Sequence, residues 1–211
     1  EDVVFDYNGQ TDGDTHKAVL QNISYEIQKG DYVAITGTSG CGKSTMLKLL
    51  MGIYEPQAGT VKVVMKDGTA LRVSDMRRLF AYVPQGNFLM GGSIRDVITF
   101  AQDSDLGQLR QVLKLACADF VYDLPDGVET VLGERGAGLS EGQMQRIAIA
   151  RALYADCPVL ILDESTSALD EQTERQLLQN LKELTDKTVF IVTHRAQALT
   201  ICNRKLVLNQ E

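Results

Sequence analysis

The apolar residues of this chain occur in short runs separated by polar turns. The runs at 159–162 and 188–193 are apolar on both faces, which indicates strands buried on both sides of a sheet. Residues 3–7 instead alternate, with Val3, Phe5 and Tyr7 on one face of a predicted strand. Further strands are predicted at 19–27, 32–36, 80–83 and 206–208, and a hairpin is predicted to join 61–65 to 69–73.

Helical patterns occupy 44–51, 93–118, 140–154 and 171–184, and Ser140 is the predicted N-cap of the third helix. Strands that alternate with helices, around wholly apolar central strands, predict an α/β fold with a mainly parallel sheet. The first strands predict an additional N-terminal antiparallel β portion. The helical residues from about 86 to 156 predict an inserted helical subdomain, which leaves a core of about 1–85 and 157–211.

Composition narrows the class of protein. With 44% hydrophobic and 23% charged residues, the chain has the make-up of a soluble globular domain. Its net charge of -7 argues against a nucleic-acid partner, since such proteins usually carry a basic face. None of the 4 cysteines forms a C-x-x-C pair, so reduced thiols are expected. The chain begins with Glu1 and ends soon after an apolar strand, so we expect a domain of a longer polypeptide.

A glycine-rich loop follows the predicted strand at 32–36 and precedes a predicted helix. It fits the pattern G-x-x-x-x-G-K-[ST], in which backbone N–H groups and a helix N-terminus surround phosphate oxygens. Lys43 supplies a charge to the outer phosphates and Ser44 a hydroxyl to Mg²⁺. The alternative is a chance glycine-rich turn, which the flanking strand and helix make improbable. The predicted phosphate-binding residues are Gly37, Thr38, Ser39, Gly40, Cys41, Gly42, Lys43, Ser44 and Thr45.

Two acids end the apolar run at 159–162. A carboxylate at Asp163 is suited to hold Mg²⁺, directly or through water. Glu164, one residue further, is suited to polarise an attacking water. The alternative is an acidic helix cap or a solvated pair, which a neighbouring phosphate loop disfavours.

These motifs, with Leu139-Ser140-Glu141-Gly142-Gln143 between them, resemble the nucleotide-binding domain of an ATP-binding cassette (ABC) protein, built on a P-loop NTPase core. Residues 82–85 are similar to its Q-loop, 167–170 to its D-loop and 193–195 to its switch region. Tyr7 matches the aromatic residue that stacks on adenine, although packing beside Val3 and Phe5 is an alternative.

The resemblance implies a role for each motif. Glu164, His194, Lys43 and Gln85 would be catalytic, and Ser44, Gln85 and Asp163 would hold Mg²⁺. The signature residues Ser140, Gly142 and Gln143, with Asp170, would serve an ATP held by a second domain in a head-to-tail dimer. Ser140 as a helix N-cap suits this role, because a helix N-terminus attracts anions.

Glu141 departs from the family pattern, which has glycine there. A carboxylate facing a triphosphate would repel it, so we expect Glu141 to face outward, where it favours the helix dipole.

Residues 130–136 and 93–98 are similar to segments of ABC exporters. In that group Glu134 and the Gln85 region would contact the membrane domains, although a plain hairpin at 130–136 is an alternative. The resemblance implies an ATPase motor at the cytoplasmic face of the cell membrane, with a membrane domain upstream of residue 1. A soluble ABC ATPase acting on ribosomes or DNA, and a regulatory module without turnover, are the competing interpretations.

Overall fold

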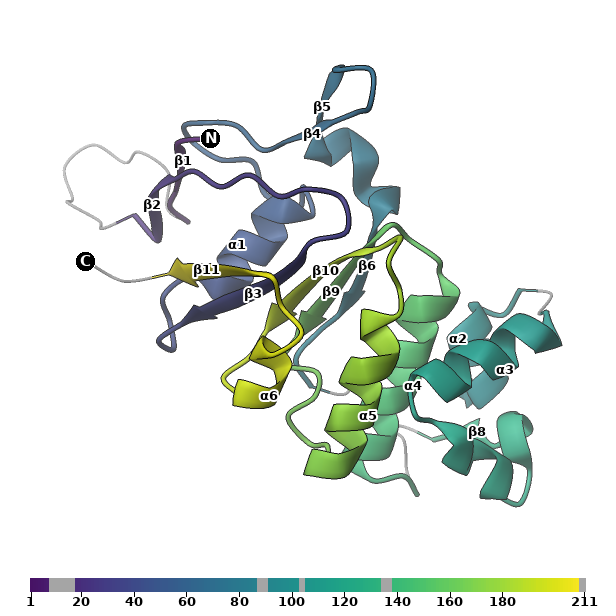
Figure 1. Cartoon of the computed structure of the whole chain (residues 1–211). Coiled ribbons are helices and arrows are strands. Elements are labelled where there is room, and N and C mark those ends of the chain that lie inside the picture. The colour runs from purple at the N-terminus through teal and green to yellow at the C-terminus, as the bar shows by residue number, and fades with distance from the viewer. Residues whose placement is uncertain (8–17, 87–90, 103–104, 134–137, 209–211) are drawn as a thin grey trace.

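A computed structural model describes residues 1–7, 18–86, 91–102, 105–133 and 138–208 of the chain. Its centre is a five-stranded sheet whose strands are all parallel (Figure 1). The strand order confirms the predicted α/β fold with a mainly parallel sheet. From one edge to the other the strands are β11 (Arg204–Leu208), β3 (Tyr32–Gly37), β10 (Thr188–Val192), β9 (Val159–Asp163) and β6 (Phe80–Val83).

Both faces of this sheet are covered, as the apolar runs predicted. Along β9, Ile161 packs against α1 (Lys43–Leu50), whereas Leu160 and Leu162 pack on the opposite face. That opposite face is covered by α4 (Glu141–Tyr154), α5 (Glu171–Lys182) and the short α6 (Ala196–Leu199). Period-2 alternation along each strand therefore divides the core into two apolar layers.

Antiparallel strands lie beside the parallel sheet, as expected. β1 (Val3–Phe5) pairs with β2 (Leu20–Ile23), which is shorter than the predicted 19–27. The hairpin of β4 (Lys62–Val64) and β5 (Ala70–Arg72) forms where it was predicted, and a 3₁₀ helix η1 (Val73–Leu79) follows it.

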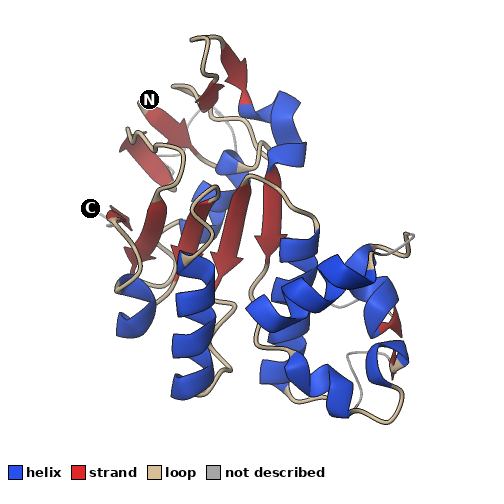
Figure 2. Cartoon of the chain, turned by 45° about the vertical axis from the view of Figure 1, so that its right-hand side comes forward, coloured by secondary structure: helices blue, strands red, loops and turns tan. Residues whose placement is uncertain are grey.

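The helical pattern predicted over 93–118 forms two helices in the structure and not one continuous helix. The chain forms α2 (Ile94–Thr99) and α3 (Leu106–Leu115), which are separate in Figures 1 and 2. Phe100 ends α2 in the left-handed conformation at φ 57°, and the Asp105 side chain accepts the N–H groups that begin α3. The remaining short elements were not predicted: η2 (Asp119–Asp123), η3 (Gly127–Glu129), β7 (Gly92–Ser93) and β8 (Val131–Leu132).

Within the described ranges, no helix combines the length and the apolar content that crossing a membrane requires.

Candidate active site

The sheet collects the predicted motifs at one edge. β3, β6, β9 and β10 are parallel, and Val192 pairs with both Asp163 and Ile35. Their carboxyl ends therefore lie together, which is where ligands bind in open α/β sheets. The phosphate loop follows β3, Gln85 follows β6, and His194 follows β10.

The backbone of the phosphate loop turns where a side chain would not fit. Gly37 has φ 153°, and a Cβ there would lie 2.3 Å from the carbonyl oxygen of Leu208 and 2.5 Å from Cys41 Sγ. Only glycine adopts this path without moving β11. The loop then leads directly into α1, whose first N–H groups lack partners within the helix and are available to an anion.

The predicted phosphate-binding residues divide by exposure. Thr38, Ser39 and Ser44 are exposed at the loop, whereas Thr45 is buried. Cys41 is only 2% exposed and its thiol packs in the apolar layer beneath the loop. Only the backbone of Cys41 is therefore placed to serve a ligand.

The Lys43 ammonium lies across the loop. Its Nζ donates hydrogen bonds to the carbonyl oxygens of Gly37 and Thr38, each at 2.9 Å. These neutral acceptors hold the charge next to the N-terminus of α1. Phosphate oxygens are stronger acceptors for the same ammonium, because the hydrogen bond becomes charge-assisted on both sides.

Asp163 ends β9 with a nearly buried carboxylate, which is 5% exposed. Burial raises the pKa of the Asp163 carboxyl and the Glu164 charge adds to this, while a hydrogen bond from Tyr82 and the charge of Lys43 lower it. Tyr82 Oη donates to Asp163 Oδ2 at 3.0 Å. A buried carboxylate of this kind favours a cation beside it.

Glu164 stands at the centre of the predicted catalytic group. Gln85 Nε2 donates to its Oε2 at 2.8 Å, and His194 Nε2 lies 3.7 Å from its Oε1. Its backbone adopts φ 48°, unusual for a residue with a side chain, and its N–H donates to the Val192 carbonyl at 3.0 Å. Strain of this kind tends to gather at functional sites. The three residues predicted to act together are thus in contact.

The oxygens at this edge suit Mg²⁺. Ser44 contributes a hydroxyl, Gln85 an amide carbonyl and Asp163 a carboxylate, the hard donors that Mg²⁺ prefers. No group of three or more His, Cys, Asp or Glu in the described residues is arranged to hold a metal. Mg²⁺ at phosphate sites commonly takes few protein ligands together with the phosphates, so this donor set fits the ion.

Tyr7 is anchored beside the phosphate loop. Its Oη lies 2.7 Å from Thr45 Oγ1, and its ring packs edge-on against Phe5 and Tyr54, with centroids 5.2 and 5.7 Å away. Tyr7 is nevertheless 53% exposed, unlike the buried Phe5. The partial exposure leaves ring surface for a ligand, and adenine stacking stays a prediction.

The signature turn forms a capping box at the start of α4. Ser140 Oγ accepts the Gln143 N–H at 3.2 Å, and Gln143 Oε1 accepts the Ser140 N–H at 2.8 Å. The predicted N-cap at Ser140 is confirmed. Glu141 is exposed in the first turn, where its charge favours the helix dipole. Since α4 and α1 lie on opposite faces of the sheet, the signature turn and the phosphate loop begin helices of different layers.

Gly142 gives α4 its close approach to the D-loop. A Cβ at Gly142 would lie 2.8 Å from the Ala168 carbonyl oxygen. Next to it the buried Gln145 accepts the Ala168 N–H at 3.1 Å and donates to Ser167 Oγ at 3.3 Å. Sequence reasoning missed Gln145, although a polar residue between apolar positions of a helix face was a signal.

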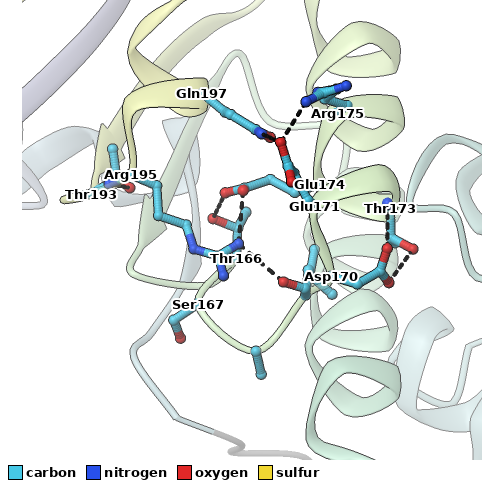
Figure 3. A network of polar contacts seen from close by, with 12 residues as sticks. Thr166, Ser167, Asp170, Glu171, Thr173, Glu174, Arg175, Thr193, Arg195 and Gln197 are labelled. Atoms are coloured by element: carbon cyan, nitrogen blue, oxygen red, sulfur yellow. Dashed lines mark hydrogen bonds and ion pairs between the residues drawn. The ribbon is translucent and has the colours of Figure 1, made fainter.

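A second set of contacts fixes the D-loop from the other side (Figure 3). Asp170 caps α5 by accepting from the Thr173 N–H at 2.9 Å, and hydrogen bonds to the Thr173 side chain and backbone lower the pKa of Asp170. Glu174, 2% exposed, accepts from Thr166 Oγ1 at 2.9 Å and from Arg195 Nη1 at 2.7 Å. Arg195 Nη1 also donates to the Leu169 carbonyl at 3.0 Å.

No pattern in the sequence indicates that Arg195 and Glu174 are in contact, because the two residues lie on different elements. Glu134, predicted to contact membrane domains, lies outside the described residues.

Known proteins are similar to this chain in sequence and in fold. The family model described as "ABC transporter" matches residues 20–167. The ATP-dependent lipid A-core flippase of Vibrio cholerae is 38% identical over 214 residues, which cover 100% of this chain and 36% of that protein. The alpha-hemolysin translocation ATP-binding protein HlyB of Escherichia coli O157:H7 is 42% identical over 197 residues, covering 90% of this chain and 28% of HlyB.

Solved structures agree with these relatives. A bacterial Atm1-family ABC exporter with ATP bound superposes with a TM-score of 0.86 and 34% identity, over 100% of this chain and 37% of that one. The chain thus spans about a third of the length of the proteins it matches.

Proposed function

The chain belongs to the ABC transporter family, and we propose that it is the motor domain of an exporter, which binds and hydrolyses Mg·ATP to drive transport across a membrane. The names of its relatives favour an exporter over a soluble ABC ATPase acting on ribosomes or DNA. The net charge of -7 at pH 7 also disfavours a nucleic-acid partner.

ATP binding would rest on the phosphate loop. Lys43 would exchange two backbone carbonyls for phosphate oxygens, and the N-terminus of α1 would add its dipole. Mg²⁺, held by Ser44, Gln85 and Asp163, would neutralise charge on the phosphates. Tyr7 would stack on the base.

Hydrolysis would depend on Glu164 as the group that activates water. The contact of Glu164 with Gln85 and His194 is the single observation that carries this proposal, because it joins the base to two groups suited to a phosphate. Gln85 Nε2 donates to one carboxylate oxygen of Glu164, and Gln85 is also a proposed Mg²⁺ ligand. Gln85 would therefore link the metal to the group that activates water.

A second copy, or a related domain, would complete the site. Ser140 and Gly142 at the N-terminus of α4 would contact the outer phosphate of an ATP held by the partner, with Gln143 and Asp170 beside them. One chain would therefore hold two half-sites, and ATP would act as the ligand between two domains arranged head to tail.

Transport would follow from this closure. A closed pair must favour one orientation of the membrane domains for ATP binding to do work on them. The region around Gln85, and the loop that carries Glu134, are the surfaces we assign to those membrane domains at the cytoplasmic side.

The test is Glu164→Gln, which removes the base and preserves shape. The variant should form a stable dimer with Mg·ATP in size-exclusion chromatography, whereas the wild-type chain hydrolyses ATP and returns to monomer. Lys43→Ala should bind no ATP and stay monomeric, and Lys66→Ala, in the turn between β4 and β5, is the matched surface control. A Glu164→Gln chain that binds ATP yet stays monomeric at high protein concentration would contradict the proposed head-to-tail dimer.

A further inference from the structure

Tyr82 on β6 and Asp163 at the end of β9 share a face of the sheet. The strands are parallel neighbours, and Tyr82 pairs with Ile161, two residues before Asp163. Side chains two residues apart in a strand point the same way. Tyr82 also packs with the apolar layer on the α1 side, as Ile161 does. Its long ring therefore reaches forward along the sheet to the carboxylate.

The phenol is the donor in this contact. A phenol keeps its proton at neutral pH, because its ordinary pKa is about 10. The hydroxyl donates this proton in a hydrogen bond to Asp163 Oδ2, and the two oxygens are 3.0 Å apart. Within the described residues, Asp163 Oδ1 accepts no hydrogen bond. A neutral donor also leaves the negative charge of Asp163 in place, whereas a lysine or arginine would cancel it.

We propose that Tyr82 is a positioning residue for the Mg²⁺ site. Its hydroxyl holds Asp163 by Oδ2 and so keeps Oδ1 directed to the metal or to its water. This rests on the proposed function, where Asp163 holds Mg²⁺. A carboxylate without the phenol turns about its terminal torsion, which has broad minima, and must be ordered when the ion arrives. Groups outside the first ligand shell commonly orient metal ligands in this way.

The same hydrogen bond joins the two strands that carry Mg²⁺ ligands. Gln85 follows Tyr82 by three residues, and Asp163 ends the neighbouring strand. Tyr82 therefore couples the end of β6 to the end of β9 at the metal position.

The competing role for Tyr82 is packing alone. Its ring contributes to the apolar layer over α1, and loss of the ring would loosen the sheet edge whatever the hydroxyl does. Tyr82→Phe separates the two roles, because it removes the hydroxyl and keeps the ring. Tyr82→Leu removes both.

The experiment measures metal binding directly. The 211-residue chain is loaded with a stoichiometric, non-hydrolysable ATP analogue, and Mn²⁺ is titrated while the EPR signal of free Mn²⁺ is recorded. Tyr82→Phe should bind Mn²⁺ about ten- to a hundredfold more weakly, the range for losing a hydrogen-bond partner of a metal ligand. Affinity for the analogue in EDTA should not change. Tyr32→Phe, which removes a buried phenol hydroxyl from the opposite layer, is the control and should bind Mn²⁺ like the wild type.

Each outcome bears on a different claim. If Tyr82→Phe binds Mn²⁺ within about twofold of the wild-type affinity, the positioning role is overturned. If Tyr82→Leu weakens Mn²⁺ binding and Tyr82→Phe does not, the ring acts by packing alone and the positioning role is again overturned. If the wild-type complex holds Mn²⁺ no more tightly than the free analogue does, the proposed Mg·ATP site fails instead.

Discussion

The Arg195 guanidinium donates from Nη1 to Glu174 Oε2 at 2.7 Å, and this ion pair joins the loop after β10 to α5. Glu174 is 2% exposed, while the Arg195 side chain is 38% exposed. Thr166 donates to the other Glu174 oxygen, and Arg195 reaches the Leu169 carbonyl (Figure 3). The residue after His194 is therefore bound to Leu169 of the D-loop and to Glu174 of α5.

Arg195→Gln should lower the free energy of unfolding by about 2 kcal/mol, below the 3–5 kcal/mol typical of a broken buried pair because the arginine is partly solvated. The cost arises because the Glu174 carboxylate stays buried with Thr166 as its remaining donor. Urea unfolding measures it, and adding Glu174→Gln should recover part of the loss. Arg175→Gln, which breaks the exposed Arg175–Glu171 pair on the same helix, should cost less than about 0.5 kcal/mol. Equal losses in the two variants would contradict the buried-pair account.

Gly142→Ala should weaken ATP-driven dimerisation without weakening ATP binding by the monomer. The added methyl would meet the Ala168 carbonyl at 2.8 Å, so the D-loop or α4 must move. Alanine favours a helix by about 1 kcal/mol over glycine, so a net loss of stability would show that the close approach outweighs propensity. Fluorescent ATP binding and size-exclusion chromatography measure the two effects.

Gly107→Ala is the matched control, since Gly107 is also the second residue of a helix. Its nearest neighbour there is a carboxylate oxygen of Asp105 at 3.1 Å, a side-chain atom that can shift. A Gly142→Ala chain that dimerises like Gly107→Ala would contradict the role assigned to the contact with Ala168.

Much of this architecture was predictable because short local patterns in the sequence indicate the strands, helices and loops. The buried strands β9 and β10 appear as apolar runs, and the phosphate loop is a contiguous motif between a strand and a helix. The helical pattern over 93–118 did not reveal where one helix ends and the next begins, because Phe100 ends α2 with a left-handed backbone. Sequence carries no strong signal for such a conformation at a non-glycine residue.

The candidate site was predictable residue by residue, but its internal bonds were not. The ion pair of Arg195 with Glu174 and the hydrogen bond of Tyr82 to Asp163 join residues 21 and 81 positions apart. Such pairs depend on the register of neighbouring strands and on how helices pack over them. The spacing of residues within one helix or strand does not predict such pairs between elements.

Ser165→Ala should leave stability unchanged or raise it by up to about 1 kcal/mol. The Ser165 hydroxyl is buried, 2% exposed, and no hydrogen-bond partner for it occurs in the described parts of the chain. An unsatisfied buried hydroxyl costs free energy, which alanine removes. The neighbouring Thr166→Val is the control and should lose about 1–2 kcal/mol, because Thr166 donates to the Glu174 carboxylate. Chemical unfolding of both variants tests the contrast, and an equal loss for Ser165→Ala would contradict it.

Alkaline pH should destabilise the chain partly through Tyr32. Burial raises the pKa of the Tyr32 phenol from 10.0 to about 12, and the negative charges of Asp186 and Cys202 contribute further. The unfolded chain therefore loses this proton more readily than the folded one. The stabilisation is complete below pH 10 and is lost as pH rises toward 12.

Tyr32→Phe should flatten the fall of stability between pH 10 and 12, because it removes the group that titrates there. At neutral pH the same variant should be less stable by about 1 kcal/mol, since the hydroxyl donates to the carbonyls of Leu181 and Leu184. The two stability curves should therefore converge with rising pH and cross before pH 12, because a rise in pKa from 10.0 to about 12 outweighs about 1 kcal/mol. Urea midpoints measured from pH 8 to 12 test this, and curves that stay parallel would show that Tyr32 does not govern the alkaline loss.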